Sequence, residues 1–175
     1  MSTVNLEQYA VELARAARLA GRKLAVTSGQ QRNDALVAMA VGLREQSDKL
    51  VAENARDLAK APEYGLSKAA IDRLRLDKAG VEKMAISVQE VAAQTDPVGQ
   101  AIEGRVRPNG LRIEKRRVPI GVVAIIYEAR PNVTSDAAAL CIKSGNACIL
   151  RGGSESLYSN LAIGQVIAEA VQKVG

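Results

Sequence analysis

Two short runs of polar residues in this chain have the composition of a ligand site. The run YEARPN (residues 127–132) contains a carboxylate, a guanidinium and an amide. The run RGGSE (residues 151–155) contains a guanidinium, two glycines, a hydroxyl and a carboxylate. Guanidinium groups and backbone N–H groups bind phosphate, and a carboxylate can accept hydrogen bonds from ribose hydroxyls. The two runs therefore point to an anion or nucleotide site.

Each polar run follows an apolar segment that is typical of a buried strand. The segment GVVAIIY (residues 121–127) is rich in β-branched residues, as expected for a strand covered on both faces. A helix is predicted over residues 133–145, a second short strand over residues 147–150, and another helix over residues 154–175. This alternation predicts a βαβα unit with a parallel sheet, in which ligands bind beyond the carboxyl ends of the strands.

Each run also has a purely structural explanation. RGGSE can be a loop in which Ser154 caps a helix, and Arg-Pro-Asn can be a plain turn. Taken singly, each motif is more often structural, but two such motifs at one sheet edge favour a site. The Rossmann fingerprint G-x-G-x-x-G is absent, so the standard mode of dinucleotide binding is not predicted.

The first half of the chain is predicted to be a series of amphipathic helices joined by short loops. Asn5 is a predicted N-cap, Gly29 is expected to follow the first helix, and Ser47 or Asp48 is expected to cap the third. The helices are expected at residues 6–26, 30–46, 47–60, from Ser67 through Leu74, and from Asp77 to about Ala93.

A β-hairpin is predicted between the helices and the βαβα unit. The segment GRVRPNGLRIEKRRVPI (residues 104–120) alternates polar and apolar residues on both sides of Pro108-Asn109-Gly110. Asn-Gly between such arms is a strong hairpin signal. Because a two-stranded arm is marginal alone, we expect it to pair with another element, for example in a partner subunit.

The composition excludes several classes of protein. The net charge of +5 is spread along the chain, without the interleaved aromatic residues that stack on nucleobases, so nucleic-acid binding is not expected. No histidine and only two cysteines, Cys141 and Cys148, leave almost no zinc ligands, so no metal site is expected. No apolar run approaches the length of a membrane span or forms a signal peptide. We expect a cytoplasmic protein with reduced thiols.

The segment RVPIGVVAIIYEARPNVTSDAAALCIKSGNACILRGGSESLYSN (residues 117–160) closely resembles the gamma-glutamyl phosphate reductases, also called glutamate-5-semialdehyde dehydrogenases, a family of the aldehyde dehydrogenase superfamily. The segments NARDLAKAPEYGLSKAAIDRLRL and DPVGQAIEGRVRPNGLRIEKRRVPIG fit the same family, so the resemblance spans nearly the whole chain. It implies an α/β fold with an aldehyde dehydrogenase-like, doubly wound cofactor domain. Residues 1–96 would be its helical region, residues 97–117 a β-hairpin oligomerisation arm, and residues 118–175 its first βαβα unit.

The resemblance implies a reaction and a cofactor. Family members reduce L-glutamate 5-phosphate to L-glutamate 5-semialdehyde and phosphate with NADPH, in proline biosynthesis. A cysteine thiolate attacks the acyl phosphate, and the resulting thioester accepts a hydride. The family's nucleophile lies downstream of residue 175, so the chain is expected to be an N-terminal portion that is inactive alone. Cys141 and Cys148 are expected to be structural thiols, because no histidine is present to activate them.

The resemblance also assigns roles to individual residues. Asn132 matches the asparagine whose amide stabilises the oxyanion, and family hairpin arms imply a homodimer or a larger homo-oligomer. The relatives' Lys-Pro-Ser-Glu, which holds the adenosine ribose, is replaced here by an arginine and one extra glycine. Arg151 suits the 2′-phosphate of NADPH, because a guanidinium binds phosphate bidentately. The remaining expected site residues are Gly152, Gly153, Ser154 and Glu155 for the cofactor, and Glu128 and Arg130 for the substrate.

An alternative remains open from the residues alone. The chain could be a non-catalytic module that binds a nucleotide or another anion through helix N-termini and Arg151. Restoration of hydride transfer by the remaining part of a reductase chain would distinguish the enzyme from the module.

Overall fold

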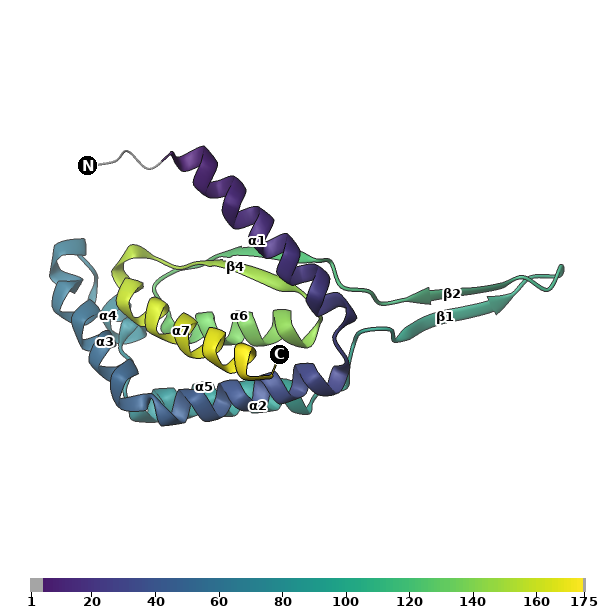
Figure 1. Ribbon diagram of the computed structural model, residues 1–175. Coiled ribbons are helices and arrows are strands. Elements are labelled where there is room, and N and C mark those ends of the chain that lie inside the picture. Colours follow the sequence, from purple (N-terminus) through teal and green to yellow (C-terminus); the bar gives the residue numbers. More distant parts are fainter. Residues whose placement is uncertain (1–4, 175) are drawn as a thin grey trace.

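A computed structural model describes residues 5–174 and shows a helical body from which a long β-hairpin projects (Figure 1). The elements are, in chain order, α1 (Leu6–Val26), α2 (Gly29–Glu45), α3 (Ser47–Lys60), the 3-10 helix η1 (Ala61–Tyr64), α4 (Lys68–Leu74), α5 (Lys78–Ala93), β1 (Ala101–Val106), β2 (Arg112–Arg116), β3 (Val122–Ile126), α6 (Pro131–Lys143), β4 (Ala147–Arg151), the 3-10 helix η2 (Ser154–Ser156) and α7 (Leu157–Val174).

The helix starts follow from local capping. Asn5, Ser67 and Asp77 are extended N-cap residues whose side chains accept hydrogen bonds from backbone N–H groups of α1, α4 and α5, which confirms the predicted helix starts. Gly29 follows α1, as predicted, and is also the first residue of α2, behind a capping box. The predicted cap at Ser47 or Asp48 was wrong, because α3 begins at Ser47 without a side-chain cap.

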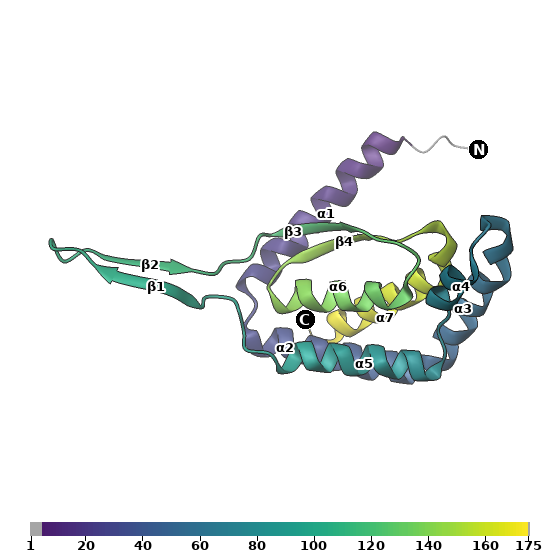
Figure 2. The same ribbon diagram turned by 180° about the vertical axis from the view of Figure 1, so that it is seen from behind.

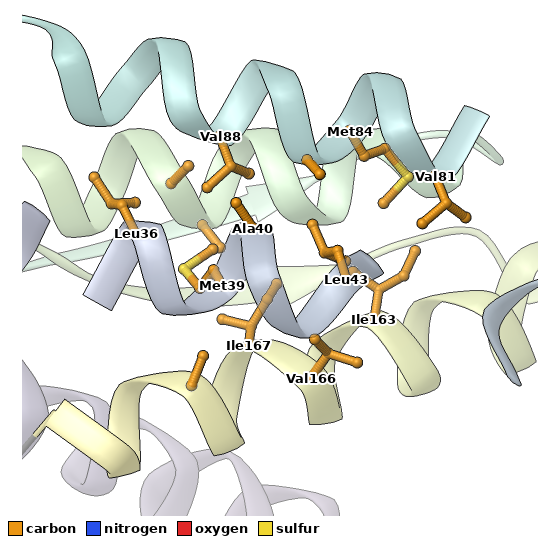
Figure 3. Close-up of a cluster of buried hydrophobic side chains, with 14 of the residues drawn as sticks. Leu36, Met39, Ala40, Leu43, Val81, Met84, Val88, Ile163, Val166 and Ile167 are labelled. Atoms are coloured by element: carbon orange, nitrogen blue, oxygen red, sulfur yellow. The ribbon is translucent and has the colours of Figure 1, made fainter. Parts of the chain in front are cut away.

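One apolar core joins the helical region to the βαβα unit. Helix α2 lies between α5 and α7, and the buried side chains of all three helices meet there (Figure 3). Because the chain has no Phe or Trp, this core is filled by aliphatic and methionine side chains. Its fully enclosed members include Leu36, Met39, Leu43, Val88 and Ile163.

Buried polar residues of α3 fix the start of α7. The Asp57 carboxylate accepts hydrogen bonds from the backbone N–H of Tyr158 (3.0 Å) and from the N–H and hydroxyl of Ser159 (2.8 and 2.6 Å). Asn54 donates to the Ser159 hydroxyl and to the Leu74 carbonyl. These contacts cap α7 from a distant helix and thereby hold the RGGSE segment that precedes it.

The parallel pairing of β3 with β4 confirms the predicted βαβα unit. Val122 lies opposite Ala147, and the register continues to Ile126 opposite Arg151. Figure 2 shows the two strands side by side, with α6 along one face. The prediction that the first strand is covered on both faces was wrong, because Ala124 and Ile126 are exposed. Helix α1 contacts both strands but leaves these side chains open.

The hairpin of β1 and β2 is antiparallel and fully exposed. Gly110 N–H donates to the Arg107 carbonyl (2.9 Å), and Arg107 N–H donates to the Leu111 carbonyl (2.9 Å). Gly110 takes the left-handed conformation, with φ +84°, that this three-residue loop requires. The predicted hairpin is therefore confirmed, with Pro108-Asn109-Gly110 as its loop.

The root of the hairpin is tied to the helical body. Arg32, buried in α2, donates to both oxygens of Asp96 (2.9 and 2.7 Å), and Asp96 also accepts from the N–H of Val98 (3.0 Å). Lys143 at the end of α6 donates to Asn33 and to the Ala92 carbonyl, both at 2.7 Å. These bonds hold the helical region, the hairpin root and α6 together.

Candidate functional site

The two strand exits are adjacent in space. Tyr127 N–H donates to the Arg151 carbonyl (3.1 Å) and extends the β3–β4 ladder by one residue. Beyond this bond the two segments separate. The segment after β3 leads into α6, and the segment after β4 leads into η2 and α7. The structure thus places both polar runs at the carboxyl edge of the parallel sheet, where ligands bind in such sheets.

A cavity of about 680 Å³, here called the glycine cavity, lies at this edge. It contains Arg151, Gly152, Gly153 and Ser154, four of the five residues predicted to bind the cofactor. Its other lining residues are Tyr9, Tyr127, Thr134, Leu150, Leu157, Asn160, Leu161, Gly164 and Gln165. Mixed apolar and polar walls of this size are typical of a small-molecule site.

A chain of hydrogen bonds supports the wall of the glycine cavity. The Thr134 hydroxyl donates to the Asn160 side-chain oxygen (3.0 Å), so the Tyr127 hydroxyl donates to Thr134 (2.7 Å). Asn160 in turn donates to the Ser156 hydroxyl (2.8 Å). Burial raises the pKa of Tyr127, which keeps this phenol protonated as a donor.

Thr134 and Asn160 had no role predicted from the sequence. The sequence does contain an indication for Thr134, which is a polar residue at a helix position that should face the core. Thr134 is buried in the structure, and a buried hydroxyl needs a hydrogen-bond partner.

The two glycines allow the loop to pass close to neighbouring side chains. A Cβ atom on Gly152 would collide with the Asn160 amide and would lie 3.1 Å from the Tyr127 ring. A Cβ atom on Gly153 would lie within 2.7 Å of the Glu155 carboxylate. The Glu155 carboxylate lies beside Gly153, where it accepts from the Ser154 hydroxyl (3.4 Å), and does not line the glycine cavity. Arg151 is exposed and donates to the Gly152 carbonyl.

Asn132 lies in a different hollow. A second cavity of about 360 Å³, here called the basic cleft, is formed between the start of α6, helix α5 and the segment that follows α4. Its lining residues are Arg73, Arg75, Leu76, Gly80, Lys83, Met84, Ser87, Pro131, Asn132 and Asp136. Asn132 and Thr134, two residues apart on α6, therefore line different cavities.

The basic cleft holds the Asn132 amide in a fixed position. Asn132 Nδ2 donates to one oxygen of Asp136 (3.0 Å), and the Ser87 hydroxyl donates to the other oxygen (3.1 Å). Pro131 occupies the first turn of α6, where its missing N–H costs nothing. The second hydrogen of the Asn132 amide is left for another acceptor.

The other two predicted substrate residues lie at the rim. Glu128 and Arg130 are exposed, and neither lines the glycine cavity or the basic cleft. Glu128 approaches Arg73, with 3.9 Å between the carboxylate and the guanidinium. Their contact with a substrate remains a prediction.

Neither cysteine lines these cavities. Cys141 is buried in α6, whereas Cys148 in β4 is half-buried and less enclosed than predicted. The neighbouring Cys141 thiol, together with burial, raises the pKa of the Cys148 thiol, and the same interaction lowers the pKa of Cys141. Within residues 5–174, no three Cys, Asp or Glu side chains gather as metal ligands, and no helix is long and apolar enough to cross a membrane.

The solved structures that resemble this chain define its fold class. A probable aldehyde dehydrogenase from Listeria monocytogenes matches 96% of the chain with a TM-score of 0.69 at 19% identity, and the match covers 34% of that protein. At this identity the match establishes the fold alone. The fold is that of the aldehyde dehydrogenases, as predicted, in a helix-rich α/β arrangement with small sheets.

Closer matches specify the family. Gamma-glutamyl phosphate reductase from Thermotoga maritima matches with a TM-score of 0.89 at 40% identity, over 93% of this chain and 39% of that one. The curated reductase from Desulfatibacillum aliphaticivorans is 50% identical over 98% of this chain and 41% of its own length, and that from Caulobacter vibrioides is 53% identical over 93% and 40%. No family model matches. The resemblance to gamma-glutamyl phosphate reductase is confirmed, and the chain spans about two fifths of these curated relatives.

Proposed function

We propose that this chain forms the cofactor-binding and oxyanion-binding part of an NADPH-dependent reductase, which converts L-glutamate 5-phosphate to L-glutamate 5-semialdehyde and phosphate in proline biosynthesis. The observation that carries the proposal is the sequence identity of 50%, over 98% of the chain, to a curated protein named for this activity. The glycine cavity and the basic cleft are both lined by residues near the start of α6 and would supply the two binding regions such a reaction needs.

The residues of the glycine cavity fit a nicotinamide dinucleotide. Arg151 offers a guanidinium for phosphate, including the 2′-phosphate of NADPH, and Gly152 and Gly153 leave their backbone open to close approach. Leu157 and Leu161 offer an apolar surface to the base. The bound cofactor would supply the hydride. Glu155 would act indirectly, by supporting the loop.

Asn132 would stabilise the charge that develops on the carbonyl oxygen of the substrate. Its amide is oriented in advance by the hydrogen bond to Asp136, and one amide hydrogen is left for the oxyanion. Removal of one such preorganised donor typically costs about 3 kcal/mol of transition-state stabilisation.

The thiolate nucleophile would come from outside residues 1–175. The two cysteines of this chain lie away from both cavities, and the raised pKa of Cys148 disfavours its thiolate. The curated relatives are more than twice as long as the aligned region, which leaves room for a catalytic cysteine elsewhere. By itself the chain would bind ligands without turnover.

The hairpin would join subunits into a homodimer or a larger homo-oligomer. Its strands are exposed throughout, and apolar side chains such as Ile102, Val106 and Leu111 are more than half exposed on it. An open strand edge with apolar side chains favours pairing with another strand. We further propose a cytoplasmic location, where the two cysteines would stay reduced.

A non-catalytic nucleotide-binding module remains the second candidate, because the described residues offer a ligand cavity that neither cysteine lines. Two measurements on the purified chain separate the candidates. We expect no reduction of NADP⁺ with glutamate semialdehyde and phosphate from the chain alone, and turnover once a segment carrying the relatives' remaining length is added. Turnover by the chain alone that Cys141→Ala or Cys148→Ala abolishes would contradict the proposal.

Cofactor choice is tested by a fluorescence titration with NADPH and NADH. We expect NADPH to bind more tightly than NADH. Arg151→Gln should reduce the ratio of the two affinities about tenfold, because a charge-assisted contact to phosphate is lost. Lys173→Gln, which neutralises an exposed cation away from the glycine cavity, serves as the control. An unchanged preference in Arg151→Gln would refute the role of Arg151.

A further inference from the structure

The basic cleft has a charge arrangement that the oxyanion role of Asn132 does not explain. Three cationic side chains, Arg73, Arg75 and Lys83, line this cavity together with the carboxylate of Asp136. Arg73 has a partner at its edge, since Glu128 lies 3.9 Å away. Within residues 5–174, no carboxylate forms an ion pair with Arg75 or Lys83. The cleft therefore presents two cations that are free to bind a ligand.

Asp136 makes the cleft unsuitable for a simple anion. Its two oxygens each accept one hydrogen bond, from Ser87 and from Asn132, and each can accept a further one. A negative charge beside a phosphate would be unfavourable, whereas a cation joined to an anion would satisfy both signs of charge. A zwitterion has that pattern, with an ammonium and a carboxylate on one carbon.

The size of the cleft agrees with a small zwitterion. Its volume of about 360 Å³ is near the lower end for small-molecule sites and about half that of the glycine cavity. The cleft is also close to the Asn132 amide, at the start of α6. Because Asn132 itself lines the cleft, a ligand held here would lie within reach of that amide.

We propose that the basic cleft binds the α-amino-acid end of the substrate, with Arg75 and Lys83 on the α-carboxylate and Asp136 on the α-ammonium. This inference rests on the proposed function and names the groups that select an α-amino acid over a simple dicarboxylate. Asp136 is then both a substrate-binding residue and a positioning residue for Asn132.

Calorimetric titration of the purified chain tests the cleft without cofactor or turnover. L-glutamate serves as the complete ligand, glutarate lacks the ammonium, and 4-aminobutyrate lacks the α-carboxylate. We expect glutarate and 4-aminobutyrate each to bind at least about tenfold more weakly than L-glutamate, because each lacks one of the two charged groups that the cleft would hold. Arg75→Gln and Lys83→Gln should each lower the affinity for L-glutamate about fivefold to tenfold, while the control Lys173→Gln leaves that affinity unchanged.

Asp136→Asn gives the sharpest outcome. This variant should bind L-glutamate more weakly but bind glutarate as before, because only L-glutamate carries an ammonium. Thermal unfolding of the variant verifies that the fold is kept. The proposal is overturned if L-glutamate does not bind, if Asp136→Asn weakens both ligands equally, or if inorganic phosphate binds more tightly than L-glutamate and displaces it. Because no hydride transfer is measured, failure of the reductase proposal would leave this result interpretable.

Discussion

Gly152 and Gly164 both line the glycine cavity but differ in what surrounds them. A Cβ on Gly152 would strike the Asn160 amide, which belongs to the hydrogen-bond chain through Thr134 and Tyr127. A Cβ on Gly164, inside α7, would meet no atom within 4 Å. The requirement for glycine at residue 152 is therefore one of space, because no positive φ is involved.

We expect Gly152→Ala to lower the free energy of unfolding by about 1 to 3 kcal/mol, as is usual when a packed site receives an extra carbon. Gly164→Ala, the matched control, should leave it unchanged or raise it by up to about 1 kcal/mol, since alanine favours a helix. Urea unfolding of the two variants measures the difference. Equal stability of both variants would show that the loop moves freely away from Asn160.

At the scale of elements, the contacts at Asp96 join the start of α2 to the hairpin root. Burial alone would raise the pKa of Asp96, but hydrogen bonds from the Val98 N–H and from Arg32 outweigh it and lower the pKa below its ordinary value of 3.8. A carboxyl group with a lowered pKa stabilises the fold when ionised. The contribution of Asp96 to the free energy of unfolding is complete above pH 3.8, the ordinary pKa of the group. It is lost as the pH falls through the lower pKa that Asp96 has in the folded protein.

Asp96→Asn should lower the free energy of unfolding by roughly 2 kcal/mol at pH 7, because it leaves the buried Arg32 without its counter-charge. The loss should not be larger, because Asp96 itself is partly exposed and its charge is screened by solvent. The gap between wild type and variant should shrink below pH 3.8, as the wild-type carboxylate becomes protonated. Urea unfolding at pH 7, 5 and 3 measures the gap, with exposed Asp72→Asn as the control. A gap that is constant from pH 7 to 3 would contradict the assignment.

The whole molecule consists of a packed body and a projecting arm (Figure 1). The body has one core shared by α2, α5, α6 and α7, whereas every residue of β1 and β2 is exposed. The arm therefore adds little to the stability of the body, and its own two strands need a further partner to be stable. A second copy of the chain would supply that partner.

We expect sedimentation equilibrium to give at least twice the chain mass of 18.5 kDa for the intact protein. Replacement of residues 101–116 by a short Gly-Ser linker should give the monomer mass while thermal unfolding of the body is nearly unchanged. Lys173→Gln should assemble like the intact chain. Equal masses for the intact and linker forms would exclude the arm as the assembly contact.

The sequence by itself determined the features that depend on neighbours in the chain. Asn5, Ser67 and Asp77 mark helix starts because their side chains reach N–H groups two or three residues ahead. Pro108-Asn109-Gly110 marks the hairpin because Gly110 readily adopts a positive φ. The alternation of apolar runs and amphipathic segments predicts the βαβα unit with its parallel strands. The segment of residues 117–160 carries the resemblance to the reductase family.

Only the tertiary structure decided which distant groups meet. Asp57 caps α7 about one hundred residues later in the chain, and Asn160 supports a loop through Thr134 of another helix. The structure also separates Asn132 from Arg151 into two cavities and leaves Glu155 beside Gly153, outside the glycine cavity. Residue type and spacing fix local backbone geometry, whereas these contacts depend on how α3, α6 and α7 pack around a common core, which no single segment specifies.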